Sequence, residues 1–154
     1  MQLVDLRRSV EDNKFGWLPP FDDTAVYANE HWWDEPRYYY DAPWFIQVLD
    51  SDGTEVARVE LLDPGEVNLS YTDAERIGGS PLEICFFEVA QNAQGRGHGT
   101  AVVKALEQRF PDRVLLAYAN TDVPEFWASL GWARFDHRDG DIEYRPMFVR
   151  DPKL

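Results

Sequence analysis

Three glycines alternate with charged or titratable residues in the middle of the chain, and this arrangement can hold an anion. Gly95, Gly97 and Gly99 occupy every second position, with Arg96 and His98 between them. Glycine lets the backbone come close to a ligand, and the free N–H groups of such a loop point at negatively charged oxygens. A helix that begins directly after the loop would add its own N-terminal N–H groups. The sequence therefore predicts an anion-binding loop.

Three regular elements would position this loop. Residues 82–89 are mostly apolar, β-branched or aromatic, which predicts a buried strand before it. Apolar residues recur at helical spacing after the loop, at Val102, Val103, Leu106 and Phe110. This spacing predicts an amphipathic helix, and the apolar run 114–119 predicts a second strand parallel to the first. Together these elements form a β-α-β unit.

The N-terminal part predicts further strands. Residues 3–10 alternate weakly and could form a first strand, and residues 24–28 could form a short helix behind an N-cap at Asp22 or Asp23. Residues 44–49 and 55–62 predict two strands of a hairpin, because an Asp-Gly pair lies between them.

The C-terminal part completes an α/β fold. Residues 66–81 lack a clear period and predict a loop with at most a strand fragment. A helix is expected to begin near Asp122 and to end at Gly131. Residues 132–136 and 142–149 flank a second Asp-Gly pair and predict another hairpin. The fold class is therefore α/β with a mixed sheet.

The bulk composition restricts the class of protein. At 154 residues with 44% apolar content, the chain is expected to form one compact domain, residues 1–154. The formal net charge of −13 argues against a nucleic-acid partner and favours a cationic small molecule or basic peptide, although an acidic surface also serves solubility. No apolar run approaches the ~20 residues of a membrane span, and no apolar leader is visible, so a cytoplasmic protein without membrane attachment is expected.

The single cysteine and the histidines give little support for a redox or metal site. Cys85 has no partner for an internal disulfide and is expected to be a buried, inert thiol in its strand. His31 with Asp34 and Glu35 could chelate a metal ion, but a solvated loop is the preferred interpretation. We therefore expect no metal cofactor.

Two common phosphate-binding motifs do not fit the glycine loop. A P-loop requires a Gly-Lys pair, and the chain contains none. A dinucleotide-binding G-x-G-x-x-G motif would need its third glycine at Thr100 or Val102. A different glycine motif is therefore needed.

Residues 94–99, Gln-Gly-Arg-Gly-His-Gly, match the pattern Q/R-x-x-G-x-G/A between a strand and a helix. This pattern resembles the pyrophosphate-binding motif of the GNAT N-acetyltransferase superfamily. The resemblance continues at Asn120 and at residues 126–132, which look like the family's F-Y-x-x-L-G-F signature. It implies a GNAT-like fold, with a mixed, mostly antiparallel sheet around a central β-α-β unit, and acetyl-CoA as co-substrate.

The resemblance also assigns cofactor-binding residues. The backbone of the strand would contact the pantetheine arm, and the loop would bind the pyrophosphate through its N–H groups. Asn120 corresponds to a position that often contacts the cofactor, but it could equally cap a strand end. The assigned residues are Phe87, Glu88, Val89, Gln94, Gly95, Arg96, Gly97, His98, Gly99, Thr100 and Asn120.

In this family an amine attacks the thioester directly, which requires a base and an oxyanion donor. Glu83 resembles the general base of histone-type acetyltransferases, and its apolar strand would raise its pKa, although it could also lie at a solvated strand end. Glu88 is a second candidate on the opposite face of the strand. The Val89 N–H is the expected oxyanion donor.

The general acid is where the chain departs from the family pattern. Trp127 occupies a position where many members carry a tyrosine, and an indole cannot supply an acidic proton. Tyr118 is near in sequence but could simply pack. The expected function is an acetyl-CoA-dependent N-acetyltransferase acting on a primary amine. A catalytically silent acyl-CoA-binding or interaction module on the same fold is the alternative.

Residues 30–44 combine three tryptophans and three tyrosines with four acids. Acceptor recognition in this family usually involves such early segments, and acids with aromatic rings suit a cationic amine. The same residues would suit a lid or a contact in a homodimer, which is slightly preferred because the segment also has to cover the sheet.

Overall fold

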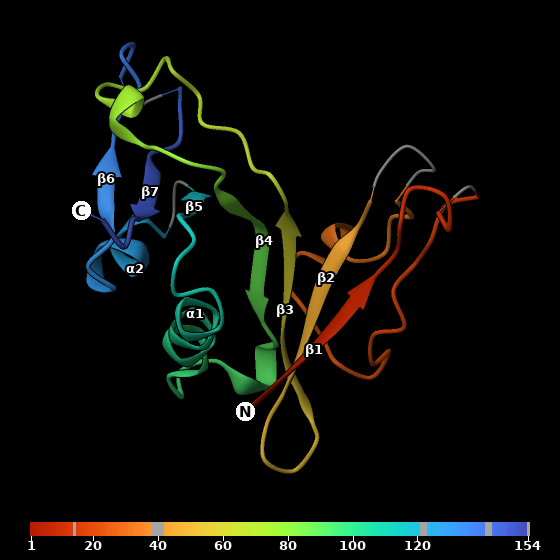
Figure 1. The fold of residues 1–154 in the computed structure, drawn as a ribbon. Coiled ribbons are helices and arrows are strands. Elements are labelled where there is room, and N and C mark those ends of the chain that lie inside the picture. Colours follow the sequence, from red (N-terminus) through yellow and green to blue (C-terminus); the bar gives the residue numbers. More distant parts are fainter. Residues whose placement is uncertain (14, 38–41, 121–122, 141–142, 154) are drawn as a thin grey trace. The chain divides into compact units, whose positions relative to one another are not determined.

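The computed structural model describes residues 1–13, 15–37, 42–120, 123–140 and 143–153 (Figure 1). Within these residues seven strands pair in the order β1-β2-β3-β4-β5-β7-β6. The strands are β1 (Gln2–Arg7), β2 (Trp44–Leu49), β3 (Glu55–Leu62), β4 (Leu82–Val89), β5 (Leu115–Tyr118), β6 (Ala133–Phe135) and β7 (Met147–Arg150). The helices are α1 (His98–Arg109) and α2 (Pro124–Ser129), with short 3-10 turns η1 (Glu30–Trp32), η2 (Ala74–Arg76) and η3 (Gln91–Ala93).

The expected mixed sheet is confirmed. β4 and β5 pair in parallel, with α1 between them in the sequence, so the predicted β-α-β unit is present. The pairs β1–β2, β2–β3, β5–β7 and β6–β7 are antiparallel. None of the helices in the described ranges is both long enough and apolar enough to cross a membrane.

The chain divides into two compact units. Unit 1 consists of Met1–Leu61 and Phe86–Leu106, and unit 2 consists of Leu62–Cys85 and Glu107–Leu154. Strand β4 contributes residues to both. The expectation of a single domain stays a prediction.

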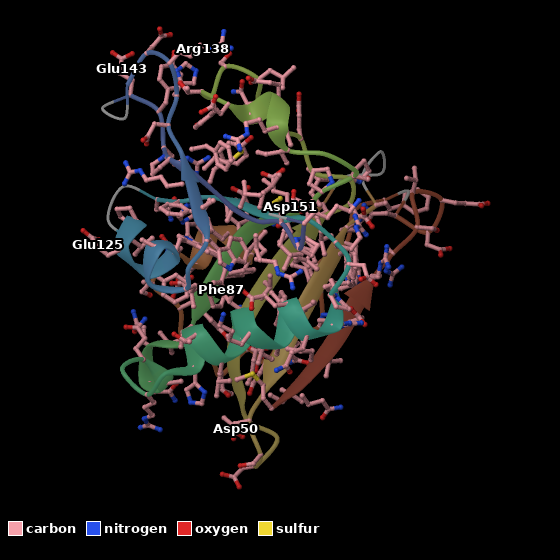
Figure 2. All side chains as sticks on the ribbon, turned by 60° about the vertical axis from the view of Figure 1, so that its left-hand side comes forward. Asp50, Phe87, Glu125, Arg138, Glu143 and Asp151 are labelled. Carbon is pink, nitrogen blue, oxygen red and sulfur yellow. The ribbon has the colours of Figure 1, made fainter. Side chains whose placement is uncertain are left out.

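Unit 1 contains the hairpin that the sequence predicts. The turn between β2 and β3 has Gly53 at φ 79°, a conformation that glycine adopts without strain. Asp50, labelled at the hairpin tip in Figure 2, accepts hydrogen bonds from the N–H groups of Asp52 (2.8 Å) and Thr54 (3.0 Å). The β-branched and aromatic residues of β2 are buried against the unit's core. Residue types and turn chemistry therefore agree here, and the predicted bounds are confirmed.

The predicted helix at residues 24–28 is wrong. The Asp22 carboxylate accepts from the N–H (2.9 Å) and the hydroxyl (2.7 Å) of Thr24, which forms a local turn. The Val26 carbonyl accepts from the Gln91 N–H at 2.9 Å instead of from a residue four positions further on. Because these backbone groups bond to a distant segment and a side chain, no helical ladder forms.

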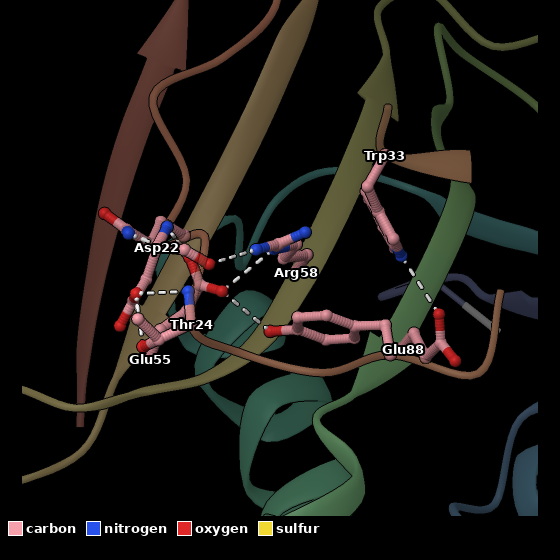
Figure 3. A network of polar contacts seen from close by, with 8 residues as sticks. Asp22, Thr24, Trp33, Glu55, Arg58 and Glu88 are labelled. Carbon is pink, nitrogen blue, oxygen red and sulfur yellow. Dashed lines mark hydrogen bonds and ion pairs between the residues drawn. The ribbon is translucent and has the colours of Figure 1, made fainter. Parts of the chain in front are cut away.

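A buried polar network fastens this N-terminal segment to β3 (Figure 3). The Glu55 carboxylate accepts from the Asp22 N–H (3.1 Å), the Tyr27 hydroxyl (3.0 Å), the Gln47 amide (2.9 Å) and the Arg58 guanidinium (2.9 Å). Glu55 is 3% exposed and Arg58 is 7% exposed. The network therefore satisfies a buried charge pair with several further hydrogen bonds.

The acidic aromatic segment, residues 30–44, contributes two buried tryptophans to unit 1, Trp33 and the first residue of β2, Trp44. Trp33 is buried, with its ring 5.9 Å from that of Phe21 and 6.4 Å from that of Phe45. Trp32 stacks on Phe86 with a centroid distance of 4.8 Å. Residues 38–41, which include its three tyrosines, lie outside the described residues.

Unit 2 has its own apolar cluster, formed by Tyr71, Ala74, Leu116, Met147 and Val149. The predicted hairpin exists as β6 and β7, but β7 begins at Met147, later than predicted. Pro146 precedes it and has no N–H for a ladder bond, while its carbonyl accepts from the Ala119 N–H at 2.9 Å. Helix α2 has Pro124 in its first turn, and Gly131 follows with φ 80°. The predicted helix start at Asp122 lies outside the described residues.

Candidate functional site

The glycine loop of unit 1 leads from β4 through η3 into α1. Gly95 has φ 75° and Gly97 has φ 80°, and no described atom lies within 4 Å of a Cβ added at either position. The Ala101 N–H donates to the Gly97 carbonyl at 3.1 Å, so helical hydrogen bonding begins there. The N–H groups of His98, Gly99 and Thr100 precede this first bond and have no helical carbonyl to donate to. The loop is thus largely exposed and is followed by the first-turn N–H groups of a helix, a combination that can bind an anion.

Strand β4 has an edge that β5 does not cover along its whole length. The paired residues are Leu82 with Leu115 and Glu83 with Leu116. Among the described residues, positions 84–89 of β4 have no partner in β5. A strand edge can exchange hydrogen bonds with the amide groups of an extended ligand. Phe87 and Val89, which the sequence assigns to the pantetheine arm, belong to this part of the strand.

The Glu88 side chain is hydrogen-bonded to other residues of unit 1. Glu88 is 8% exposed, and its carboxylate accepts from the Asn29 N–H (3.0 Å), the Asn29 amide (3.1 Å) and the Trp33 indole (2.9 Å; Figure 3). The side chain therefore holds residues 29–33 in place, and any cofactor contact at this position would come from the backbone. The Gln94 amide donates to the Val89 carbonyl at 3.3 Å.

A pocket of about 800 Å³ lies entirely within unit 2. Acids and tyrosines dominate its polar lining, which comes from β4, β5, the segment after β3 and the segment before β7. Figure 2 labels Glu143 in that last segment. The lining residues are Leu62, Glu66, Val67, Asn68, Leu69, Tyr71, Glu83, Tyr118, Glu143, Tyr144 and Arg145.

Glu83 is the partly buried carboxylate of this pocket. Burial raises its pKa above the ordinary glutamate value, and the neighbouring Glu66 carboxylate acts in the same direction. A hydrogen bond from the Glu66 N–H, 3.3 Å from Glu83 Oε2, and the charge of Arg145 oppose the shift. A carboxylate whose pKa is moved toward neutral is better suited to accept a proton from an ammonium group.

Tyr118 lies beside Glu83 in the pocket. Its hydroxyl donates to the Glu66 carbonyl at 2.9 Å and accepts from the Asn68 N–H at 3.1 Å. Burial raises the pKa of this hydroxyl. Tyr118 also packs against the apolar cluster of unit 2, so the packing role considered from the sequence is only part of what it does.

The raised pKa of Glu83 predicts a stability effect. The folded protein holds this proton more tightly than the unfolded chain, so stability falls as pH rises through the folded pKa. Glu83→Gln removes the buried charge and should therefore raise the melting temperature at pH 7. The difference in melting temperature between the variant and the wild type should shrink as pH falls below 4.5, the ordinary pKa of glutamate. Thermal unfolding of both proteins at pH 4 and pH 7 measures this; a variant less stable at pH 7 would contradict it.

The assigned residues fall into two groups. Phe87 to Val89 and Gln94 to Thr100 belong to unit 1, whereas Glu83 and Asn120 belong to unit 2. The Asn120 amide oxygen accepts from Arg145 at 3.4 Å. Trp127 is buried, with its ring 5.0 Å from that of Trp132, so it has a packing role.

Two expectations from residue type can be compared with the structure. Cys85 is only partly buried, because it faces away from the fully buried positions of β4; the expected burial is wrong. Among the described residues no group of three His, Cys, Asp or Glu side chains is arranged to hold a metal ion.

Sequence reasoning missed much of the pocket. Glu66, Asn68 and Tyr71 come from a segment without hydrophobic periodicity, where pattern analysis predicts a loop, and Tyr144 and Arg145 come from residues 142–149, where it predicts a strand.

Comparison with solved structures shows the fold. An N-acetyltransferase from Bacillus subtilis, YlbP, solved in complex with coenzyme A, is 21% identical, with a TM-score of 0.53 over 74% of this chain and 71% of that one. A structure from Corynebacterium glutamicum, described as histone acetyltransferase HPA2 and related acetyltransferase, is 14% identical; its TM-score is 0.54 over 73% of this chain and 66% of that one. AtaTR, solved with AcCoA, is 12% identical, with a TM-score of 0.52 over 98% of this chain and 94% of that one.

No curated protein sequence matches the chain. The model of the acetyltransferase (GNAT) family, in contrast, matches residues 5–132. This match spans most of the chain, including the glycine loop, β4, β5 and α2. The chain therefore belongs to the acetyltransferase (GNAT) family.

Proposed function

We propose that this protein is an N-acetyltransferase that transfers the acetyl group of acetyl-CoA to a primary amine by direct attack. The observation that carries the proposal is Glu83, a partly buried carboxylate with a raised pKa in a polar pocket of a GNAT chain. Acetyl-CoA is the co-substrate of the family, and the coenzyme complexes of YlbP and AtaTR support its assignment here.

The proposed reaction assigns one role to each group. Glu83 accepts a proton from the ammonium of the acceptor, directly or through water, and the neutral nitrogen attacks the thioester carbon. A new C–N bond forms as the C–S bond breaks, and the attacking nitrogen gives up its second proton to water. Coenzyme A leaves as a thiolate that takes a proton from water. The loop N–H groups of residues 95–100 would bind the pyrophosphate, and the Val89 N–H would stabilise the oxyanion.

The proposed acceptor is a cationic amine. Glu66, Glu83 and Glu143 line the pocket with three carboxylates against the single guanidinium of Arg145. Tyrosine rings in the same lining add faces on which a cation can rest. Trp33, in the segment considered earlier for acceptor recognition, is buried in the core of unit 1. We therefore assign the acceptor to the pocket of unit 2.

A silent acyl-CoA-binding module remains the second candidate, because Trp127 is buried and cannot supply a proton. A thiol-release assay with acetyl-CoA and a panel of primary amines separates the two. Release of coenzyme A together with an N-acetylated product supports the enzyme. Cofactor binding without turnover on any amine supports the module, and absence of cofactor binding contradicts both.

The glycine loop can be tested by its backbone conformation. Gly97→Ala should weaken coenzyme A binding about tenfold, or ~1.4 kcal/mol, because it strains φ 80° and places a methyl group where the pyrophosphate would approach. Gly53→Ala is a matched control, since Gly53 has φ 79°, equally open surroundings and a place in the β2–β3 turn. Calorimetric titration with coenzyme A measures both. Equal losses of affinity would contradict a specific role for the loop.

A further inference from the structure

We propose that Tyr118 is a positioning residue that holds the Glu83 carboxylate in place through the backbone of residues 65–68. The proposal rests on the proposed role of Glu83 as the base. It concerns residues of unit 2 only, and it gives a function to a tyrosine that the reaction does not otherwise use.

The backbone of residues 65–68 connects the two side chains. On one side, the Tyr118 hydroxyl donates to the Glu66 carbonyl (2.9 Å) and accepts from the Asn68 N–H (3.1 Å), so that it bonds to both ends of residues 66–68. On the other side, the Glu66 N–H donates to Glu83 Oε2 at 3.3 Å. Glu66 therefore bonds to Tyr118 through its carbonyl and to Glu83 through its N–H.

Gly65 shows how closely this backbone approaches Glu83. A Cβ added at Gly65 would lie 2.5 Å from the Glu83 Cβ and 3.1 Å from the Glu83 nitrogen. Only glycine therefore fits at position 65 unless Glu83 or the backbone of residue 65 moves. The Gly65 N–H also donates to the Pro81 carbonyl at 2.8 Å, which fixes this end of the segment. The segment thus contacts Glu83 through backbone atoms, and Tyr118 fixes the other end.

The geometry favours positioning over proton donation by Tyr118. The hydroxyl proton is already committed to the Glu66 carbonyl, and burial raises the pKa of the phenol. A hydroxyl that both donates and accepts has two fixed partners and can orient a backbone segment. Tyr118→Phe removes both bonds while keeping the ring that packs in the apolar cluster.

The charged or titratable groups that line the pocket with Glu83, among the described residues, all bear on the expected result. They are Glu66 from the segment after β3, Tyr118 from β5, Tyr71 from the segment before η2, and Glu143, Tyr144 and Arg145 from the segment before β7. The Glu66 N–H and Arg145 lower the pKa of Glu83, whereas the Glu66 carboxylate raises it. Loosening the backbone of residues 65–68 should consequently raise the pKa of Glu83, and removing the Glu66 charge should lower it.

The test is a titration of Glu83 by carbon NMR on protein with carboxyl-labelled glutamate, with the signal assigned through Glu83→Gln. Tyr118→Phe should raise the midpoint by about 0.5 to 1 pH unit, because the Glu66 N–H bond is weakened. Glu66→Gln should lower the midpoint. Tyr144→Phe is the matched control: it removes a hydroxyl from the same pocket but not one bonded to Glu66, and it should leave the midpoint unchanged.

A second variant tests the inference independently, in case Tyr118→Phe does not fold. Gly65→Ala should push the same backbone away from Glu83 and raise the midpoint, whereas Gly78→Ala, in open surroundings of the same unit, should not. An unchanged midpoint in folded Tyr118→Phe, or equal midpoints for both glycine variants, would overturn the inference. Because the titration needs no turnover, it remains decisive if no amine is acetylated, which would instead contradict the proposed function.

Discussion

Glu83→Gln should lower the turnover number for amine acetylation by about 10²- to 10⁴-fold, the range that general base catalysis contributes. Glutamine keeps the size of the side chain and can still accept from the Glu66 N–H, but it cannot take a proton. The variant should also lose the rise of turnover with pH that we expect of the wild type below neutrality. Binding of coenzyme A, measured by calorimetry, should stay nearly unchanged because the assigned cofactor residues of the loop are untouched.

The control for this prediction is a carboxylate outside the pocket. Glu75 lies in η2 and is exposed, so Glu75→Gln makes the same chemical change without altering the pocket. Its steady-state rates should match those of the wild type from pH 6 to pH 9. If Glu83→Gln also matched the wild type, Glu83 would have no place in the mechanism.

Glu55→Ala should lower the free energy of unfolding by about 3 to 5 kcal/mol, the cost of breaking a buried ion pair from one side. The substitution leaves the Arg58 guanidinium, 7% exposed, without its carboxylate partner. It also removes the acceptor of the Tyr27 hydroxyl and the Gln47 amide. The Asp22 carbonyl, 2.8 Å from Arg58, and the nearby faces of Phe21 and Tyr27 compensate only in part.

Urea unfolding measures this cost when Glu55→Ala is compared with a variant that breaks an exposed ion pair. Asp136 pairs with Arg134 at 2.9 Å, and both side chains are more than 40% exposed. Asp136→Ala should therefore cost no more than about 1 kcal/mol. A similar, small loss in both variants would show that the Glu55 network does not stabilise the fold of unit 1.

The sequence predicts those elements whose residue types and periodicity agree. Strand β4 was expected at residues 82–89 and is found there, because its apolar run is bounded by Pro81 and by the segment leading to the glycines. The β2–β3 hairpin follows from its Asp-Gly turn. The GNAT motif then indicates the family, because the glycine loop has the expected strand before it and the expected helix after it. The family model, which matches residues 5–132, agrees.

Tertiary interactions explain where the predictions fail. At residues 24–28 the helix signal is outweighed by hydrogen bonds from the Thr24 N–H to the Asp22 carboxylate and from the Gln91 N–H to the Val26 carbonyl. At residue 142 alternation predicts a strand, but β7 starts only after Pro146. The pocket depends on two irregular segments that converge on Glu83 and Tyr118, and no local pattern encodes this convergence. Glu83 itself could be proposed only through the family resemblance.

The central claim is that ionisation of Glu83 controls acetyl transfer, and one paired measurement tests it most directly. The pH dependence of turnover at saturating acetyl-CoA and amine is compared with the NMR titration of the Glu83 carboxyl in the complex with coenzyme A and that amine. We expect the two midpoints to coincide, above the ordinary glutamate value of 4.5, since burial raises the pKa of Glu83. A Glu83 midpoint at or below that value, or turnover that does not change as Glu83 titrates, would contradict the claim.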